Sequence, residues 1–214
     1  MSLCEAYQDL KYLLNRGYRK KVALKFVADH HRLTIEERHL LARCVFPDPW
    51  IEEVRRKLLK PGELAGRVLA IDGFNVLITL ESIVEGKAIL CEDGLVRDLK
   101  YQGRYRLNEN TEKLLTEITG ALGELGVAKA VFFYGKNVPK SGIVKALTEE
   151  ALKKSGLPGE VHLVKSPDFE LKGFEAVATA DVGIISKVGH VFDLPGYVAG
   201  LSQKTIEPFF EVIQ

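Results

Sequence analysis

The stretch VLAIDGFNV, residues 68–76, indicates a buried strand that ends in an aspartate. Residues 68–71 form a short apolar run, and Asp72 follows directly. Similar apolar runs occur at residues 128–134, 161–164, 176–179 and 190–192, with helical patterns between them. Strands that alternate with helices predict an α/β fold in which helices flank a parallel sheet.

The same stretch is also compatible with a β-hairpin. The residues DGFN lie between two apolar runs, residues 68–71 and 76–78, and such a loop is typical of two antiparallel strands. In that arrangement Asp72 would lie in a turn and not at the edge of a parallel sheet.

The sequence before this stretch predicts a small all-α domain. Leucines at helical spacing end at Gly17, and Thr34 and Glu37 have the spacing of a capping box. Asp48-Pro49 is typical of the start of a further helix, which Pro61-Gly62 would end. The expected organisation is a basic helical domain at residues 1–62 and an α/β domain at residues 63–214.

Composition limits the class of protein. Of 214 residues, 46% are hydrophobic and 28% are charged, which is enough for a packed core and excludes a disordered chain. No apolar stretch approaches the roughly 18 residues of a membrane span, and the first 20 residues lack a signal sequence. We therefore expect a cytoplasmic protein that does not bind membranes. Cys4, Cys44 and Cys91 are odd in number and far apart, so we expect reduced thiols.

Positive charge is concentrated in the helical part. Residues 1–66 carry a net charge of +4, and the remainder carries −3. Such a patch suits phosphates, although a solvated helix face is the simpler explanation. In the segment 81–106, arginines surround Tyr101 and Tyr105, on which unpaired bases could stack. The candidate nucleic-acid-binding residues are Arg16, Arg19, Lys20, Lys21, Arg97, Arg104 and Arg106.

Three predicted strands are followed by an aspartate. Asp72, Asp168 and Asp181 would meet at one edge, because ligand sites of open parallel sheets lie beyond the carboxyl ends of the strands. Carboxylates that are brought together repel unless they are protonated or share a cation, and an all-oxygen site suits Mg²⁺ or Mn²⁺. The constellation predicts metal-assisted hydrolysis of a phosphodiester. Alternatively, Asp168 and Asp181 only cap helices or complement their dipoles.

VLAIDGFNV resembles the opening of the PIN-like nucleases, especially the NYN branch, whose first strand ends in Asp-Gly-x-Asn. Residues 178–181, ATAD, resemble the later Thr-x-Asp strand end, and Asp168 takes the place of the acid before it. The resemblance covers residues 67 to 193. It implies an Mg²⁺- or Mn²⁺-dependent endoribonuclease in which Asp72, Asp168 and Asp181 are catalytic metal ligands and Asn75 orients Asp72. PIN-like domains often pair, which implies a homodimer as a further option.

The same family usually supplies a fourth acid. Glu112, in the first turn of a predicted helix, is the preferred catalytic candidate; Asp93 and Asp98 are rival metal ligands, and Glu81 is a weaker one. The whole chain also resembles an uncharacterised prokaryotic family that joins a helical front to a PIN-like domain.

Two functions remain open at this level. One is a metal-dependent ribonuclease, and the other is a non-catalytic RNA-binding or scaffold protein on a degenerate PIN-like fold. Phosphatases of the haloacid-dehalogenase type are excluded because Phe74 stands where they need a second acid. The chain also lacks the glycine-rich motifs of dinucleotide-binding and P-loop proteins.

Overall fold

The predicted parallel sheet is present in the computed structural model, which describes residues 3–100 and 105–214. Five strands pair in the order β5-β4-β1-β6-β7, and each pair is parallel. The α/β prediction is confirmed, and the strands match the five apolar runs. They are β1 (Val68–Asp72), β4 (Lys129–Gly135), β5 (Gly159–Val164), β6 (Ala176–Ala178) and β7 (His190–Phe192).

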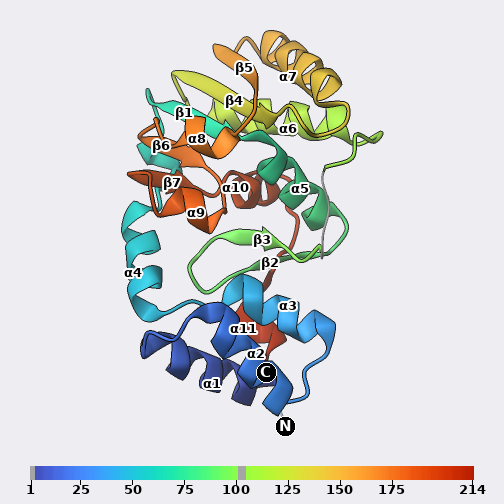
Figure 1. Ribbon diagram of the computed structural model, residues 1–214. Coiled ribbons are helices and arrows are strands. Elements are labelled where there is room, and N and C mark those ends of the chain that lie inside the picture. The colour runs from blue at the N-terminus through green and yellow to red at the C-terminus, as the bar shows by residue number, and fades with distance from the viewer. Residues whose placement is uncertain (1–2, 101–104) are drawn as a thin grey trace.

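Helices cover both faces of this sheet (Figure 1). Successive strand residues point to opposite faces, so Leu69 and Ile71 contribute to one apolar cluster and Ala70 to another. The first face packs against α5 (Gly73–Val84), α6 (Thr111–Glu124), α7 (Ser141–Ser155) and α10 (Leu194–Leu201). The second face packs against α4 (Asp48–Lys57), α8 (Pro167–Leu171) and α9 (Val182–Ile185).

The hairpin interpretation of residues 68–78 is wrong. Helix α5 begins at Gly73, directly after β1, and the residues expected to form a second strand lie inside it. Val76, Leu80 and Ile83 recur at helical spacing and are buried. Gly73 allows the close approach of β4, because a Cβ atom there would lie 2.2 Å from the ring of Tyr134.

The all-helical N-terminal region is also confirmed. Its further helices are α1 (Leu3–Asn15), α2 (Lys20–His30) and α3 (Ile35–Cys44), and the short helix η1 (Pro61–Glu63) follows α4. Thr34 and Glu37 form the predicted capping box, with both side chains accepting backbone N–H groups. Pro47, and not Asp48, occupies the N-cap of α4.

The chain forms two lobes, a helical lobe built on α1, α2 and α3 and a second lobe built on the parallel sheet, and segments from both sides of residue 62 contribute to each. Strands β2 (Ala88–Leu90), β3 (Val96–Asp98) and β8 (Glu207–Pro208) form a separate small sheet between the lobes (Figure 1). Ile89 and Phe209, the latter in α11 (Phe209–Val212), pack into the core of α1, α2 and α3. Conversely, Val54 of α4 packs on the parallel sheet.

The cysteines differ from the expectation. Cys44 of α3 and Cys91 after β2 form a disulfide that ties the helical lobe to the small sheet, so the expectation of reduced thiols is wrong for this pair; Cys4 is a free cysteine. The two residues are 47 positions apart in the sequence. They come together because β2 packs against the helical lobe. No helix in the described ranges is long and apolar enough to cross a membrane.

Candidate functional site

The strand order places a ligand-binding edge at β1 and β6. After β1 the chain adds β4 and β5 on one side, and it then adds β6 and β7 on the other side. The connections therefore diverge between β1 and β6, and open α/β sheets bind ligands just beyond the carboxyl ends of the strands at such a point. Asp72 ends β1, and Asp181 follows β6.

A hydrogen-bonded network joins the two strand ends. The hydroxyl of Thr179 donates to Asp72 Oδ2 at 3.0 Å and accepts the N–H of Asp181 at 3.1 Å. Asn75 Oδ1 accepts the N–H of Ala180 at 3.1 Å, which fixes the first turn of α5 against the end of β6. Thr179 lies within the ATAD motif but is not among the predicted site residues. Its position in Thr-x-Asp is the signal in the sequence that could have identified it.

Asn75 lies beside Asp72 and contacts the chain after β6. Its side chain bonds to the N–H of Ala180, and its backbone N–H lies near enough to the Asp72 carboxylate to lower the pKa of that group. The predicted role of Asn75 in orienting Asp72 stays a prediction. Among the hydrogen bonds of the described residues, Thr179 supplies the side-chain contact to this carboxylate.

Asp72 is a carboxyl group in surroundings that disfavour its charge. Burial, with smaller contributions from the negative charges of Asp181 and Asp168, raises the pKa of Asp72 to about 7, against the opposing effects of the Thr179 hydrogen bond and the nearby backbone N–H of Asn75. A cation at this edge would remove the repulsion. The position therefore favours either a proton or a positive ion.

This shift predicts a pH-dependent stability. Between about pH 4 and 7 the folded chain holds a proton on Asp72 that the unfolded chain has lost, so the stabilisation present at low pH disappears as pH rises through 7. A shift of this size corresponds to ~4 kcal/mol. We expect Asp72→Asn to be more stable than the unchanged protein at pH 8 and equally stable at pH 4, by urea unfolding without divalent ions. Equal stabilities at pH 8 would contradict the shift.

The other two strand-end aspartates are more exposed. Asp168 lies in the first turn of α8 after β5, two strands away from β1, and it comes near Asp72 because α8 packs back on β1 and β4. Asp181 Oδ1 accepts the N–H of Ile184 at 3.0 Å and caps α9, as the alternative interpretation predicted. Across residues 3–100 and 105–214, no group of three or more His, Cys, Asp and Glu side chains is placed to hold a metal.

The structure removes Asp93 and Arg97 from the predicted roles. Asp93 is fully buried and forms two hydrogen bonds with Arg97, at 2.6 and 2.7 Å. Trp50 Nε1 donates to the same carboxylate at 3.3 Å, and Arg97 Nε donates to the carbonyl of Ala180. Asp93 is therefore not available as a metal ligand. Arg97 is 3% exposed and already paired, so it is a structural residue at the wall of the site and not a free phosphate ligand.

The remaining acids have different surroundings. Asp98 lines the same cavity as Asp181 and pairs with Arg43 at 3.4 Å. Glu112 lies in the first turn of α6 as predicted, but its exposed carboxylate pairs with Lys154 of α7 and not with residues at the strand ends. Glu81 pairs with Lys100 at 3.1 Å. The strand ends that carry Asp72 and Asp181 form the carboxylate edge of the sheet. The structure brings Asp98, and not Glu112, next to this edge.

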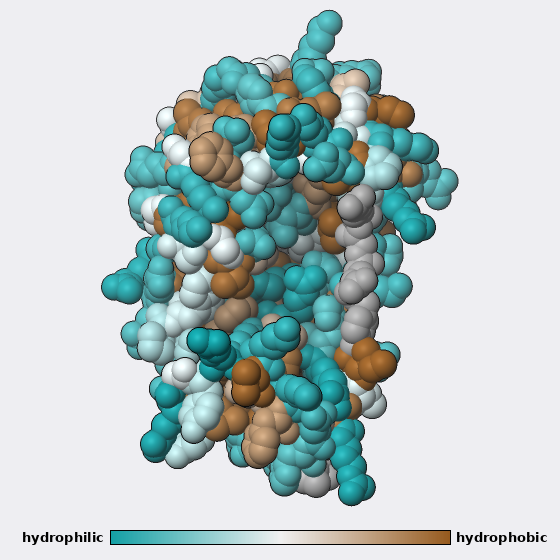
Figure 2. All heavy atoms as spheres, in the orientation of Figure 1, coloured by the Kyte–Doolittle hydropathy of each residue, from teal (hydrophilic) through white to brown (hydrophobic). Residues whose placement is uncertain are grey.

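A groove runs along this edge between the two lobes. It consists of cavities of about 450 and 870 Å³ that share Arg43, Asn75 and Asp98 in their walls. Figure 2 shows the hollow between the lobes, with hydrophilic side chains gathered in it. The cationic side chains that line the groove are those of Lys20, Arg43, Arg97, Lys100, Arg106 and Lys140.

The predicted phosphate-binding residues of the helical lobe fall into two groups. Arg16, Arg19 and Lys21 are exposed and lie outside the groove walls. Lys20 lines the smaller cavity, and its Nζ lies 3.9 Å from the ring centroid of Phe46. Burial, followed by the nearby charges of Arg97 and Arg43, lowers the pKa of Lys20 to about 8. Phe46 is not among the residues predicted from the sequence.

Besides the paired Arg97, the segment 81–106 supplies one predicted cation to the groove. Arg106 is exposed and lines the larger cavity. Tyr105 is buried and hydrogen-bonds Thr111, so the prediction that a base stacks on it is wrong. Arg104 and Tyr101 lie outside the described residues.

Comparisons with known proteins place the chain in a family. A family model described as Domain of unknown function (DUF5616) matches residues 61–197. The chain belongs to this family. A second model, described as Protein of unknown function (DUF434), matches residues 2–57. An uncharacterized protein of Methanocaldococcus jannaschii is 42% identical over 198 residues, which are 91% of this chain and 95% of the relative. No solved structure gives a significant match. The expected resemblance to an uncharacterised family is confirmed, and these descriptions leave the activity of the DUF5616 family open.

Proposed function

We propose that this chain is a metal-dependent endoribonuclease of the PIN-like type, which hydrolyses RNA at the carboxyl edge of β1 and β6. The surroundings of Asp72 carry the proposal. Asp72 lies where the sheet connections diverge, and Thr179 links its carboxylate to the backbone of Asp181. Its pKa is raised, and a basic groove runs beside it. A carboxyl group in this position is suited to sharing a cation with a phosphodiester.

The donor set fits Mg²⁺ or Mn²⁺. Asp72 and Asp181 would hold the ion, and Asp168 and Asp98 supply further carboxylates nearby. All these donors are oxygen atoms, which hard divalent ions prefer. Mg²⁺ in phosphoryl-transfer sites keeps several waters and uses only one or two protein carboxylates, so a complete protein cage is not required. When bound, the ion would lower the pKa of a water molecule and stabilise charge on the phosphate.

The residues of the chain itself would position the substrate. Lys20, Arg43, Lys100, Arg106 and Lys140 would hold the phosphates of the RNA along the groove. The Thr179 hydroxyl would keep the Asp72 carboxylate in place at the strand end. The basic groove thus delivers a phosphodiester to the carboxylate edge.

The direct test is an RNA cleavage assay. Structured and single-stranded RNAs are incubated with the protein in Mn²⁺, in Mg²⁺ or in EDTA, and products are resolved on a denaturing gel. We expect cleavage that needs the divalent ion and that is lost in Asp181→Asn. Asp29→Asn, which removes an exposed aspartate of the helical lobe, is the matched control and retains activity. Absence of cleavage in every condition would contradict the proposal.

A second candidate function is RNA binding without catalysis. Asp181 caps α9, and the described residues contain no three-carboxylate metal group, as expected of a degenerate site. This candidate predicts that the RNAs bind equally well in EDTA and in Mn²⁺, that they are not cut, and that Asp72→Asn does not change their affinity. A filter-binding assay on the same RNAs separates the two functions.

A further inference from the structure

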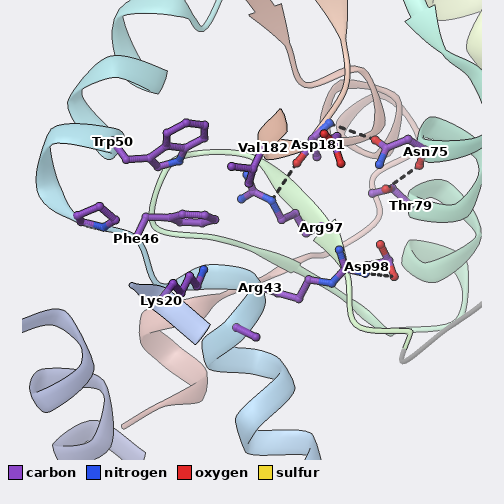
Figure 3. A pocket seen from close by; sticks show the side chains of 13 residues that line it. Lys20, Arg43, Phe46, Trp50, Asn75, Thr79, Arg97, Asp98, Asp181 and Val182 are labelled. Atoms are coloured by element: carbon purple, nitrogen blue, oxygen red, sulfur yellow. Dashed lines mark hydrogen bonds and ion pairs between the residues drawn. The ribbon is translucent and has the colours of Figure 1, made fainter. Parts of the chain in front are cut away.

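The smaller cavity of the groove combines an aromatic wall with unpaired positive charge. Phe46 and Trp50 stack on each other with ring centroids 5.8 Å apart, and both line the cavity. Figure 3 shows these rings and Lys20 on one side of the cavity and Asn75, Thr79 and Asp181 on the other side. The cavity therefore spans the distance between the helical lobe and the carboxylate edge.

The two rings have different surroundings. Phe46 is 5% exposed and has two cations over its ring, with Lys20 Nζ at 3.9 Å and the Arg97 guanidinium at 4.9 Å from its centroid. Trp50 is only partly buried, and Asp93 fixes its indole N–H. Trp50 thus offers a ring of fixed orientation to a planar ligand, whereas Phe46 is already covered.

The cations that line this cavity differ in their ion pairing, and the carboxylates of Asp98 and Asp181 line it with them. Arg97 is neutralised by Asp93 at 2.6 Å, and among the described residues Arg43 pairs with Asp98 at the longer distance of 3.4 Å. The salt bridges of these residues include none with Lys20; burial and the charges of Arg97 and Arg43 lower its pKa, against the opposing charges of Asp93 and Glu92. An anion placed between Lys20 and Arg43 would relieve this repulsion.

The size of the cavity selects a small ligand. At about 450 Å³ it lies at the lower end of the range of ~300–1,000 Å³ that small-molecule sites occupy, which suits a single nucleotide. Aromatic rings stack unpaired bases, and cationic side chains bind phosphates, which is the chemistry of single-strand recognition.

We infer that the cavity between Trp50, Lys20 and the carboxylate edge binds one unpaired nucleotide of a single-stranded RNA, with the base against Trp50 and its phosphate between Lys20 and Arg43. This inference rests on the proposed function for the identity of the ligand as RNA, and it adds the nucleotide subsite beside the cleaved bond. According to this inference, the helical lobe is the part of the protein that selects unpaired RNA.

Trp50 itself reports on binding, because it is the only tryptophan of the chain. The probes are AMP, ribose 5-phosphate, which has the phosphate but no base, and a short oligouridine, all added in EDTA so that no cleavage occurs. We expect AMP and oligouridine to quench Trp50 fluorescence in a saturable way and ribose 5-phosphate to leave it unchanged. Equal quenching by AMP and ribose 5-phosphate would overturn the placement of the base.

Neighbouring lysines supply a matched pair of variants. Lys20→Gln removes the charge inside the cavity, and Lys21→Gln removes the same charge from the exposed surface next to it. We expect Lys20→Gln to weaken AMP binding about tenfold or more, the loss typical of one charged hydrogen bond, and Lys21→Gln to leave it unchanged. Circular dichroism confirms that both variants are folded. Equal effects of the two substitutions would overturn the subsite.

The experiment separates this inference from the proposed function. Lys20-dependent quenching by AMP without RNA cleavage in Mn²⁺ would support the subsite and contradict the nuclease. Metal-dependent cleavage without quenching by AMP would support the nuclease and overturn the subsite.

Discussion

Asp72→Asn is expected to reduce metal-dependent RNA cleavage at least about a thousandfold. Asparagine has nearly the shape of aspartate and can still accept the hydrogen bond from Thr179, but it lacks the negative charge that would hold the cation. Loss of ~4 kcal/mol of transition-state stabilisation corresponds to this factor. The measurement is the single-turnover rate of cleavage in Mn²⁺ at pH 8, where the unchanged Asp72 is ionised.

The control for this substitution is Glu170→Gln. Glu170 is an exposed carboxylate on α8, the helix that carries Asp168, so its removal changes the net charge near the edge by the same amount. We expect its cleavage rate to stay within about threefold of the unchanged protein, because exposed charges are screened by salt. Equal losses in the two variants would show that net charge, and not Asp72 itself, controls the rate.

Asp93→Asn is expected to give the largest loss of stability. The substitution removes the charge that compensates Arg97, and both side chains are at most 4% exposed. Breaking a buried ion pair from one side costs about 3–5 kcal/mol, because the remaining charge stays buried without its partner. The measurement is the free energy of unfolding in urea at pH 7 without divalent ions.

A double variant tests the reason for that loss. Asp93→Leu combined with Arg97→Met replaces both charges with apolar groups, and we expect it to be more stable than Asp93→Asn alone. Glu149→Gln, which breaks the exposed pair with Lys145, leaves the unfolding midpoint nearly unchanged. A loss of less than about 1 kcal/mol in Asp93→Asn would show that the pair contributes little to the fold.

The strands were predictable because their signals are local. Each of the five runs is short and apolar, and each alternates with a helical pattern, so periodicity alone gave the α/β class. Residues 73–84 were harder, because a helix that is apolar on most sides gives the same short apolar run as a strand. Here Val76, Leu80 and Ile83 at helical spacing decide for the helix.

The site was predictable only where it depends on strand ends. Asp72 ends β1 and Asp181 follows β6, and the parallel pairing of β1 with β6 places these two strand ends side by side. Other features depend on how the segment 81–106 packs against the helical lobe. They are the Asp93–Arg97 pair, the Cys44–Cys91 disulfide and the covered ring of Phe46. Such long-range pairing leaves no local pattern in the sequence, because its partners are set by tertiary packing.

The most direct test of the carboxylate edge is a calorimetric titration with Mn²⁺ at pH 8, without RNA. The account predicts that the unchanged protein binds Mn²⁺ and that Asp72→Asn, folded by circular dichroism, binds it at least about tenfold more weakly. Equal Mn²⁺ affinity of the two proteins, or no binding by the unchanged protein, would contradict a metal site at Asp72.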